Sequence, residues 1–222
     1  MSTKAFHEEE GIEKGLRFLQ TNQNKILVGI STLVLLIAGW YGYNEYVKKP
    51  NEEKAADALF KSQGYFTLDS SRLVLNGDGQ SKGVLYVMRT FSGTKAANLA
   101  KYYAGISYLH LGEYANAVKY LEDFSTNAPQ IQLLAYGNLG DAYAELNKKD
   151  QAVTAYLKAA HHFEKDESNS SEYLFRAALL SETMGKSSEA LELYKELKEK
   201  YPKTEKGYQA DKFINRLSVQ KD

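Results

Sequence analysis

The chain of 222 residues has no cysteine, only three prolines and no excess of either charge. The absence of cysteine excludes disulfides, thiolate nucleophiles and Cys-ligated metal sites, although it does not identify a redox compartment. Because 28 basic residues balance 28 acidic ones, no global field draws the chain to nucleic acid or to anionic lipid. The scarcity of proline suits a helical protein, and 17 tyrosines suit helix packing or a binding groove.

The sequence also lacks the motifs that catalytic and cofactor sites require. It contains no P-loop, no dinucleotide-binding glycine pattern and no recognisable nucleophile–base pairing. His161 and His162, near Glu164, could bind a metal, but adjacent residues on a helix point apart, which favours a solvated helix end. Residues 76–79 alternate Asn, Gly and Asp, yet lack the spacing of a calcium loop and indicate a turn. We therefore expect no enzymatic activity, cofactor, metal, nucleic acid or small-molecule substrate.

One long uncharged segment lies near the N-terminus, between Lys25 and Glu45. Residues 26–43, at about 1.5 Å per residue, would span about 27 Å, close to the hydrocarbon thickness of a bilayer. Trp40 and neighbouring tyrosines at one end are typical of an interfacial belt, and a buried core helix would rarely be apolar all round. No small-residue cleavage site follows, so we predict an uncleaved transmembrane helix over 25–47.

A polar tail, residues 1–24, precedes this helix. It is either loosely ordered or forms a short amphipathic helix on the membrane surface around residues 11–19. Four basic residues precede the span and three follow it closely, so the positive-inside rule leaves the orientation open.

Residues 51–95 are expected to form entry helices. A helix should begin at Asn51, where a capping residue is followed by acidic side chains, and should end near Asp69. The run 84–88 is compatible with a strand or a buried helix, and helical surroundings favour the helix.

A pattern of small and aromatic residues then recurs three times over residues 98–204. Two helices cross closely only where small residues face each other, and three pairs stand twelve residues apart: Gly105 with Ala117, Gly140 with Ala152, and Ala178 with Ala190. This spacing is typical of the tetratricopeptide repeat (TPR), a helix–turn–helix unit of about 34 residues. Residues 205–222 should form a capping helix. The predicted fold class is all-α, a transmembrane helix followed by a TPR-like α-solenoid.

The first helices of TPR units line a concave groove that binds peptides or partner helices. The residues expected to line it are Leu99, Tyr102, Ile106 and Leu109, then Leu134, Asn138, Asp141 and Glu145, then Glu172, Phe175, Arg176 and Leu179. Asn138 and Arg176 would suit a clamp for a C-terminal carboxylate, whereas Tyr102 and Ile106 depart from that pattern. The alternative is that several of these side chains belong to the core.

The order of a single span and a short TPR domain resembles the bacterial YfgM-type proteins, ancillary subunits of the Sec translocon. The run Thr94-Lys95-Ala96-Ala97-Asn98-Leu99-Ala100-Lys101-Tyr102-Tyr103-Ala104-Gly105 looks like versions from Bacteroidetes-type bacteria. The resemblance implies a scaffold in the inner membrane, with the N-terminus in the cytoplasm and the repeats in the periplasm. It also implies SecYEG and a membrane-anchored, prolyl-isomerase-like periplasmic chaperone as partners, and brings no catalytic residues. A scaffold for another envelope assembly, such as division or outer-membrane secretion machinery, is the alternative.

Overall fold

The computed structural model describes residues 2–219, with side chains from residue 13 onward. Over that range the regular structure is helical throughout, and no strand forms beyond an isolated bridge between Gly77 and Lys82. The predicted all-α class is therefore confirmed. The chain divides into two compact units, Met1–Asn51 and Glu52–Asp222.

The first unit is a long helix, α1 (Ser2–Tyr43), followed by a π-helical turn, η1 (Asn44–Lys48). Helical backbone thus runs through the predicted tail as well as the predicted span. The apolar side chains of α1 have no protein cover: Leu35 is 72% exposed and Trp40 69%. Among the described residues, the helical stretch Glu13–Thr67 is long and apolar enough to cross a membrane, and its most apolar window is entirely unburied.

The expectation that a helix begins at Asn51 is wrong, because α2 (Lys49–Thr67) has already begun and continues directly from the π-helical turn. Pro50 cannot donate a backbone hydrogen bond, and its ring crowds the carbonyl four residues earlier, that of Tyr46. Tyr46 lies inside η1, where the wider turn relieves this clash. The proline therefore changes the winding of the helix instead of ending it.

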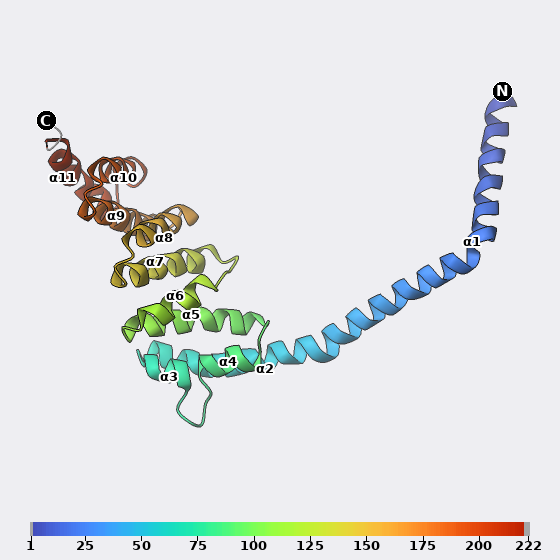
Figure 1. Ribbon diagram of the computed structural model, residues 1–222, viewed down its shortest axis with the longest axis horizontal. Coiled ribbons are helices and arrows are strands. Elements are labelled where there is room, and N and C mark those ends of the chain that lie inside the picture. The colour runs from blue at the N-terminus through green and yellow to red at the C-terminus, as the bar shows by residue number, and fades with distance from the viewer. Residues whose placement is uncertain (1, 220–222) are drawn as a thin grey trace. The chain divides into compact units, whose positions relative to one another are not determined.

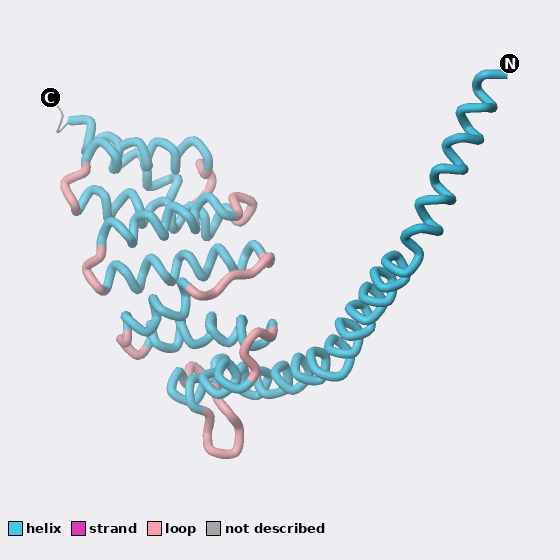
Figure 2. Tube along the Cα trace, turned by 45° about the vertical axis from the view of Figure 1, so that its right-hand side comes forward, coloured by secondary structure: helices cyan, strands magenta, loops and turns pink. Residues whose placement is uncertain are grey.

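The second unit begins within α2, at Glu52, and continues with α3 (Ser71–Asn76) and α4 (Val84–Thr90). These helices share a small core of buried residues including Ala55, Leu59 and Val84. The run 84–88 is helical, as its surroundings favoured. Figure 2 shows the long loop between α3 and α4, in which Asp78 Oδ1 accepts hydrogen bonds from the backbone N–H groups of Gln80 and Ser81. Residues 76–79 are thus organised as a turn, as the sequence indicated.

Three antiparallel helix pairs follow and stack in sequence order (Figure 1). They are α5 (Lys95–His110) with α6 (Tyr114–Glu122), α7 (Pro129–Glu145) with α8 (Lys149–His162), and α9 (Glu167–Thr183) with α10 (Ser187–Lys200). Each pair turns on a residue in the left-handed region: Gly112 (φ 75°), Asn147 (φ 56°) and Gly185 (φ 76°). Glycine adopts this conformation without steric cost and asparagine tolerates it, so a tight turn can join the two helices.

Small residues do permit close crossing inside each pair. All six predicted positions are buried, and Ala117, Ala152, Ala178 and Ala190 are 0% exposed. The side chains nearest to the two glycines lie one helical turn beyond the predicted alanines. A methyl group on Gly105 would lie 2.5 Å from Cγ of Leu121, and one on Gly140 would overlap the ring of Tyr156.

The last helix, α11 (Glu205–Val219), covers the end of the third pair. Ala210 and Leu217 are buried, and Phe213 stacks on Tyr194 with 4.8 Å between ring centroids. Arg216 donates from Nη2 to both carboxylate oxygens of Glu182, at 2.6 and 2.7 Å. The helix closes the core of the stack on one side and presents polar residues on the other.

Candidate functional site

The residues predicted to line a groove come from α5, α7 and α9, and α7 contacts both α5 and α9. They do not form one uniform surface. Ile106 is only 6% exposed and belongs to the core, and Leu109 packs against core residues. Leu179 is 40% exposed, whereas Asn138 donates its side-chain amide to the carbonyl of Leu134 in its own helix.

The structure brings Asp141 and Arg176 together in a network of charged groups. Arg176 donates from Nη1 to Asp141 Oδ1 at 2.6 Å and from Nε to Glu172 Oε1 at 2.7 Å. Lys206 of α11 lies 3.4 Å from the other oxygen of Glu172, and the Tyr156 hydroxyl donates to Asp141 at 2.7 Å. Because Arg176 already bridges two carboxylates, it is poorly placed to clamp the C-terminus of a ligand.

The pKa values of this network reflect its pairing. Burial alone would raise the pKa of Glu172, but the hydrogen bond from Arg176 together with the positive charges of Arg176 and Lys206 outweighs burial and holds the pKa below its usual range. Burial opposes the charged form of Arg176, yet hydrogen bonds and the charges of Glu172 and Asp141 raise its pKa overall. Both groups of α9 therefore stay ionised over the physiological range, and Arg176 in its charged form also pairs with Asp141 of α7.

Two tyrosines, Tyr102 of α5 and Tyr173 of α9, pack against other aromatic rings. Tyr102 packs at 5.3 Å from Phe124 and 5.9 Å from Tyr103, and burial raises its pKa to about 12. Tyr173 stacks 6.2 Å from Tyr156, and burial likewise raises its pKa to about 12. Gly137 makes room for Tyr173, because a methyl group there would overlap the tyrosine ring. The repeat signature does not include Gly137, which is why the sequence analysis missed this contact.

Leu99, one of the residues predicted to line the groove, borders two open pockets. It lines one pocket of about 710 Å³ with residues of α2, including Ala56 and Phe60. It also lines a second pocket, of about 680 Å³, with Phe124 and Ile131 near the start of α7. The accessible surface therefore extends from α2 across the N-terminal half of α5 to α7, and the sequence analysis did not assign α2 to it.

Two other predicted residues, Glu145 and Phe175, make contacts with neighbouring helices. The Glu145 carboxylate accepts a hydrogen bond from the Tyr114 hydroxyl, which raises the pKa of that hydroxyl. Phe175 packs 5.2 Å from Phe213 of α11, and the Lys206 ammonium lies 5.0 Å from the Phe175 ring. Phe175 is thus a junction between the third pair and the cap.

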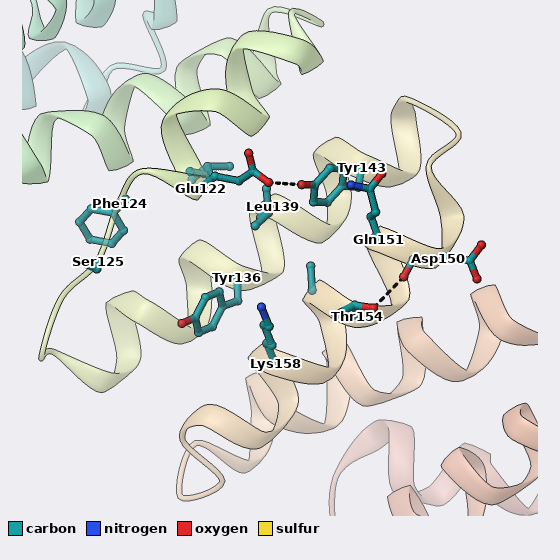
Figure 3. Close-up of a pocket in the computed structure, with 12 residues that line it drawn as sticks. Glu122, Phe124, Ser125, Tyr136, Leu139, Tyr143, Asp150, Gln151, Thr154 and Lys158 are labelled. Atoms are coloured by element: carbon teal, nitrogen blue, oxygen red, sulfur yellow. Dashed lines mark hydrogen bonds between the residues drawn. The ribbon is translucent and has the colours of Figure 1, made fainter.

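A further pocket, of about 640 Å³, opens between α6, the α6–α7 loop, α7 and α8 (Figure 3). Leu121, Phe124 and Leu139 supply apolar walls, and the Tyr143 hydroxyl donates to Glu122 across it. Asp150 is paired with Lys186 at 2.7 Å. Nowhere among the described side chains do three potential metal ligands gather.

Comparison with known proteins agrees with the geometry of the helix pairs. Residues 99–130 and 172–204 match the tetratricopeptide repeat family, and residues 133–160 match a second description of the same repeat. No curated protein matches the chain. The three matched segments coincide with α5–α6, α7–α8 and α9–α10, so the chain carries three tetratricopeptide repeats in an all-helical solenoid.

Proposed function

We propose that this chain is a membrane-anchored TPR scaffold that binds partner proteins without chemistry. The observation that carries the proposal is the pairing of an uncovered apolar helix with a separate unit of TPR repeats. An apolar helix of this length without protein cover is stable in lipid and costly in water. Tethering holds the repeats in a thin layer beside the membrane and raises their effective concentration for partners there.

The finer proposal is a scaffold beside the SecYEG translocon, with the N-terminus in the cytoplasm and the repeats in the periplasm. Its support is the order of span and repeats together with the resemblance of residues 94–105 to YfgM-type proteins. The partner there would be emerging chains or a membrane-anchored chaperone. Another envelope assembly would use the same anchor and repeats with a different partner.

Purification of the tagged full chain in mild detergent tests the finer proposal. Translocon subunits should co-purify in stoichiometric amounts, and a photo-crosslinker at Leu99 or Tyr102 should identify the protein in contact. Crosslinks to a division or secretion component would favour the alternative. A preparation with neither partner nor crosslink would contradict the scaffold itself.

Orientation can be measured directly because the chain has no native cysteine. Ser168 lies exposed in the first turn of α9, so Ser168→Cys offers one accessible thiol on the repeats. A membrane-impermeant maleimide should label this variant in intact spheroplasts and should not label Ser2→Cys. The opposite labelling pattern would place the repeats in the cytoplasm.

The boundary between the units yields a further prediction. Residues 52–222 should form a soluble domain, because their cores are closed within the second unit. Circular dichroism should show a helical spectrum with a cooperative thermal transition. Precipitation in the absence of detergent would show that the solenoid depends on the anchor.

A further inference from the structure

A groove between α2 and α5 combines an apolar floor with an acidic edge. Leu59, 4% exposed, and the partly buried Leu99 form its floor. Phe60 lies in its wall and is 75% exposed, so its ring is accessible to a ligand in the groove. We refer to this site, about 710 Å³ in volume, as the α2–α5 groove.

The charges along the groove are unequal. Glu52, Glu53 and Asp57 line it, and Lys95 is the single basic residue among its lining side chains. Glu52 is engaged, since its carboxylate accepts the backbone N–H of Lys95 at 3.0 Å. Glu53 and Asp57 lie four residues apart on α2, so both carboxylates stand on one edge of the groove. A ligand that brings positive charge to this edge would face both of them.

We propose that the α2–α5 groove binds an amphipathic helix of a partner protein that carries lysine or arginine beside its apolar face. Such a helix places apolar side chains at positions i, i+3, i+4 and i+7 into a groove of this kind. Its apolar anchors would contact Phe60 and Leu99, and its flanking cations would face Glu53 and Asp57. The acidic edge disfavours an anionic lipid surface, which attracts basic segments. The inference rests on the proposed scaffold function and specifies the chemistry of its ligand.

The test uses the full chain in phosphatidylcholine nanodiscs, with empty discs as the blank. The probe is a fluorescein-labelled, 18-residue helical peptide with leucines at i, i+3, i+4 and i+7 and flanking lysines. A second peptide carries glutamates in place of the lysines. By fluorescence anisotropy the lysine peptide should bind at least tenfold more tightly, and its advantage should shrink between 50 and 500 mM salt because exposed charges are screened.

Two variants locate the binding site. The double substitution Glu53→Lys with Asp57→Lys should weaken binding of the lysine peptide at least tenfold and should strengthen binding of the glutamate peptide. Phe60→Ala should weaken binding at least fivefold without loss of thermal stability, since its side chain is exposed. Glu199→Lys and Tyr208→Ala change an exposed charge and an exposed aromatic elsewhere, and should leave binding within twofold of the unsubstituted chain.

Several outcomes would overturn the proposal. Equal affinity for the two peptides, or binding unaffected by the groove variants, would exclude a basic helix as the ligand. Self-association in sedimentation that Phe60→Ala abolishes would assign the groove to a second copy of the chain. If peptide binding fails while crosslinks from Tyr102 still identify a partner, the scaffold function stands and this inference alone is wrong.

Discussion

At the scale of single residues, glycines and aromatic rings fit each other closely in this protein. Gly137 on α7 accepts the ring of Tyr173 from the next repeat, and Gly140 accepts the ring of Tyr156 within its own repeat. Glycine weakens a helix by up to about 1 kcal/mol relative to alanine. At these two positions that cost accompanies a close contact with an aromatic ring, which a larger residue would prevent. We expect the ring contacts to outweigh the loss of helix propensity, and substitution of the glycine tests this.

Gly137→Ala should destabilise the second unit by about 1–3 kcal/mol, because the added methyl group overlaps the Tyr173 ring and forces the repeats apart. Urea unfolding followed by circular dichroism measures this. The matched control is Gly64→Ala in α2, where nothing lies within 4 Å of the added methyl group. The control should be neutral or stabilising by up to about 1 kcal/mol. Equal effects at both sites would show that the aromatic contact is unimportant.

At the scale of elements, the bridge from Arg176 to Asp141 and Glu172 joins α7 to α9. The planar guanidinium reaches two carboxylates at once, which a lysine ammonium does less well. The sequence analysis placed Asp141 and Arg176 on the same face, because repeat spacing fixes which residues of successive first helices are neighbours. It could not show that they pair with each other, since that depends on side-chain rotamers and on the height of the helices in the stack.

Arg176→Lys should lower the free energy of unfolding by about 1 kcal/mol at neutral pH, a modest value because the side chains are only partly buried. Lys186→Ala removes the more exposed ion pair with Asp150 and should change the free energy of unfolding by less than about 0.5 kcal/mol. Glu172 has a lowered pKa when folded, so its stabilisation is present above the ordinary carboxyl pKa and is lost as the pH falls through the folded value. The effect of Arg176→Lys should therefore shrink in acid, and an effect independent of pH would contradict this role for Glu172.

The limits of the sequence are also visible at this scale. The repeats and the cap follow from helical periodicity and the apolar helix from an uncharged run, and the helical class is confirmed. The prediction that a helix begins at Asn51 was wrong, because a capping residue followed by acidic side chains indicated a helix start there. Nothing in the sequence pattern indicated the π-helical turn before Pro50. Ile106 was assigned to a groove because TPR spacing gives the face of a helix but not the depth of the neighbouring helix.

At the scale of the whole molecule, buried tyrosines make the solenoid sensitive to alkali. Burial raises the pKa of Tyr102 and Tyr173 to about 12, and burial with the hydrogen bond to Glu122 raises that of Tyr143 to about 12. A raised folded pKa means that the unfolded chain loses its protons first. The contribution of these groups is complete below pH 10 and is lost as the pH rises toward 12.

The free energy of unfolding should therefore fall steeply between pH 10 and 12, as measured by urea titration of the full chain in detergent. Tyr102→Phe keeps the ring but removes one titrating hydroxyl, so its stability should fall less steeply over that interval. Tyr208→Phe, at a position 72% exposed, is the control and should follow the unsubstituted chain. Parallel curves for all three proteins would refute a contribution from Tyr102.

The left-handed turns at Gly112, Asn147 and Gly185 have a consequence for how such a protein changes over generations. Because every pair reverses direction on one residue in the left-handed region, the antiparallel pair is the unit that repeats along the chain. A tandem duplication of residues 129–166 would add one such pair, while the junction between the two copies would lack the contact of Gly137 with Tyr173. The array can thus lengthen by whole units, with the apolar helix before it in the chain and the cap after it.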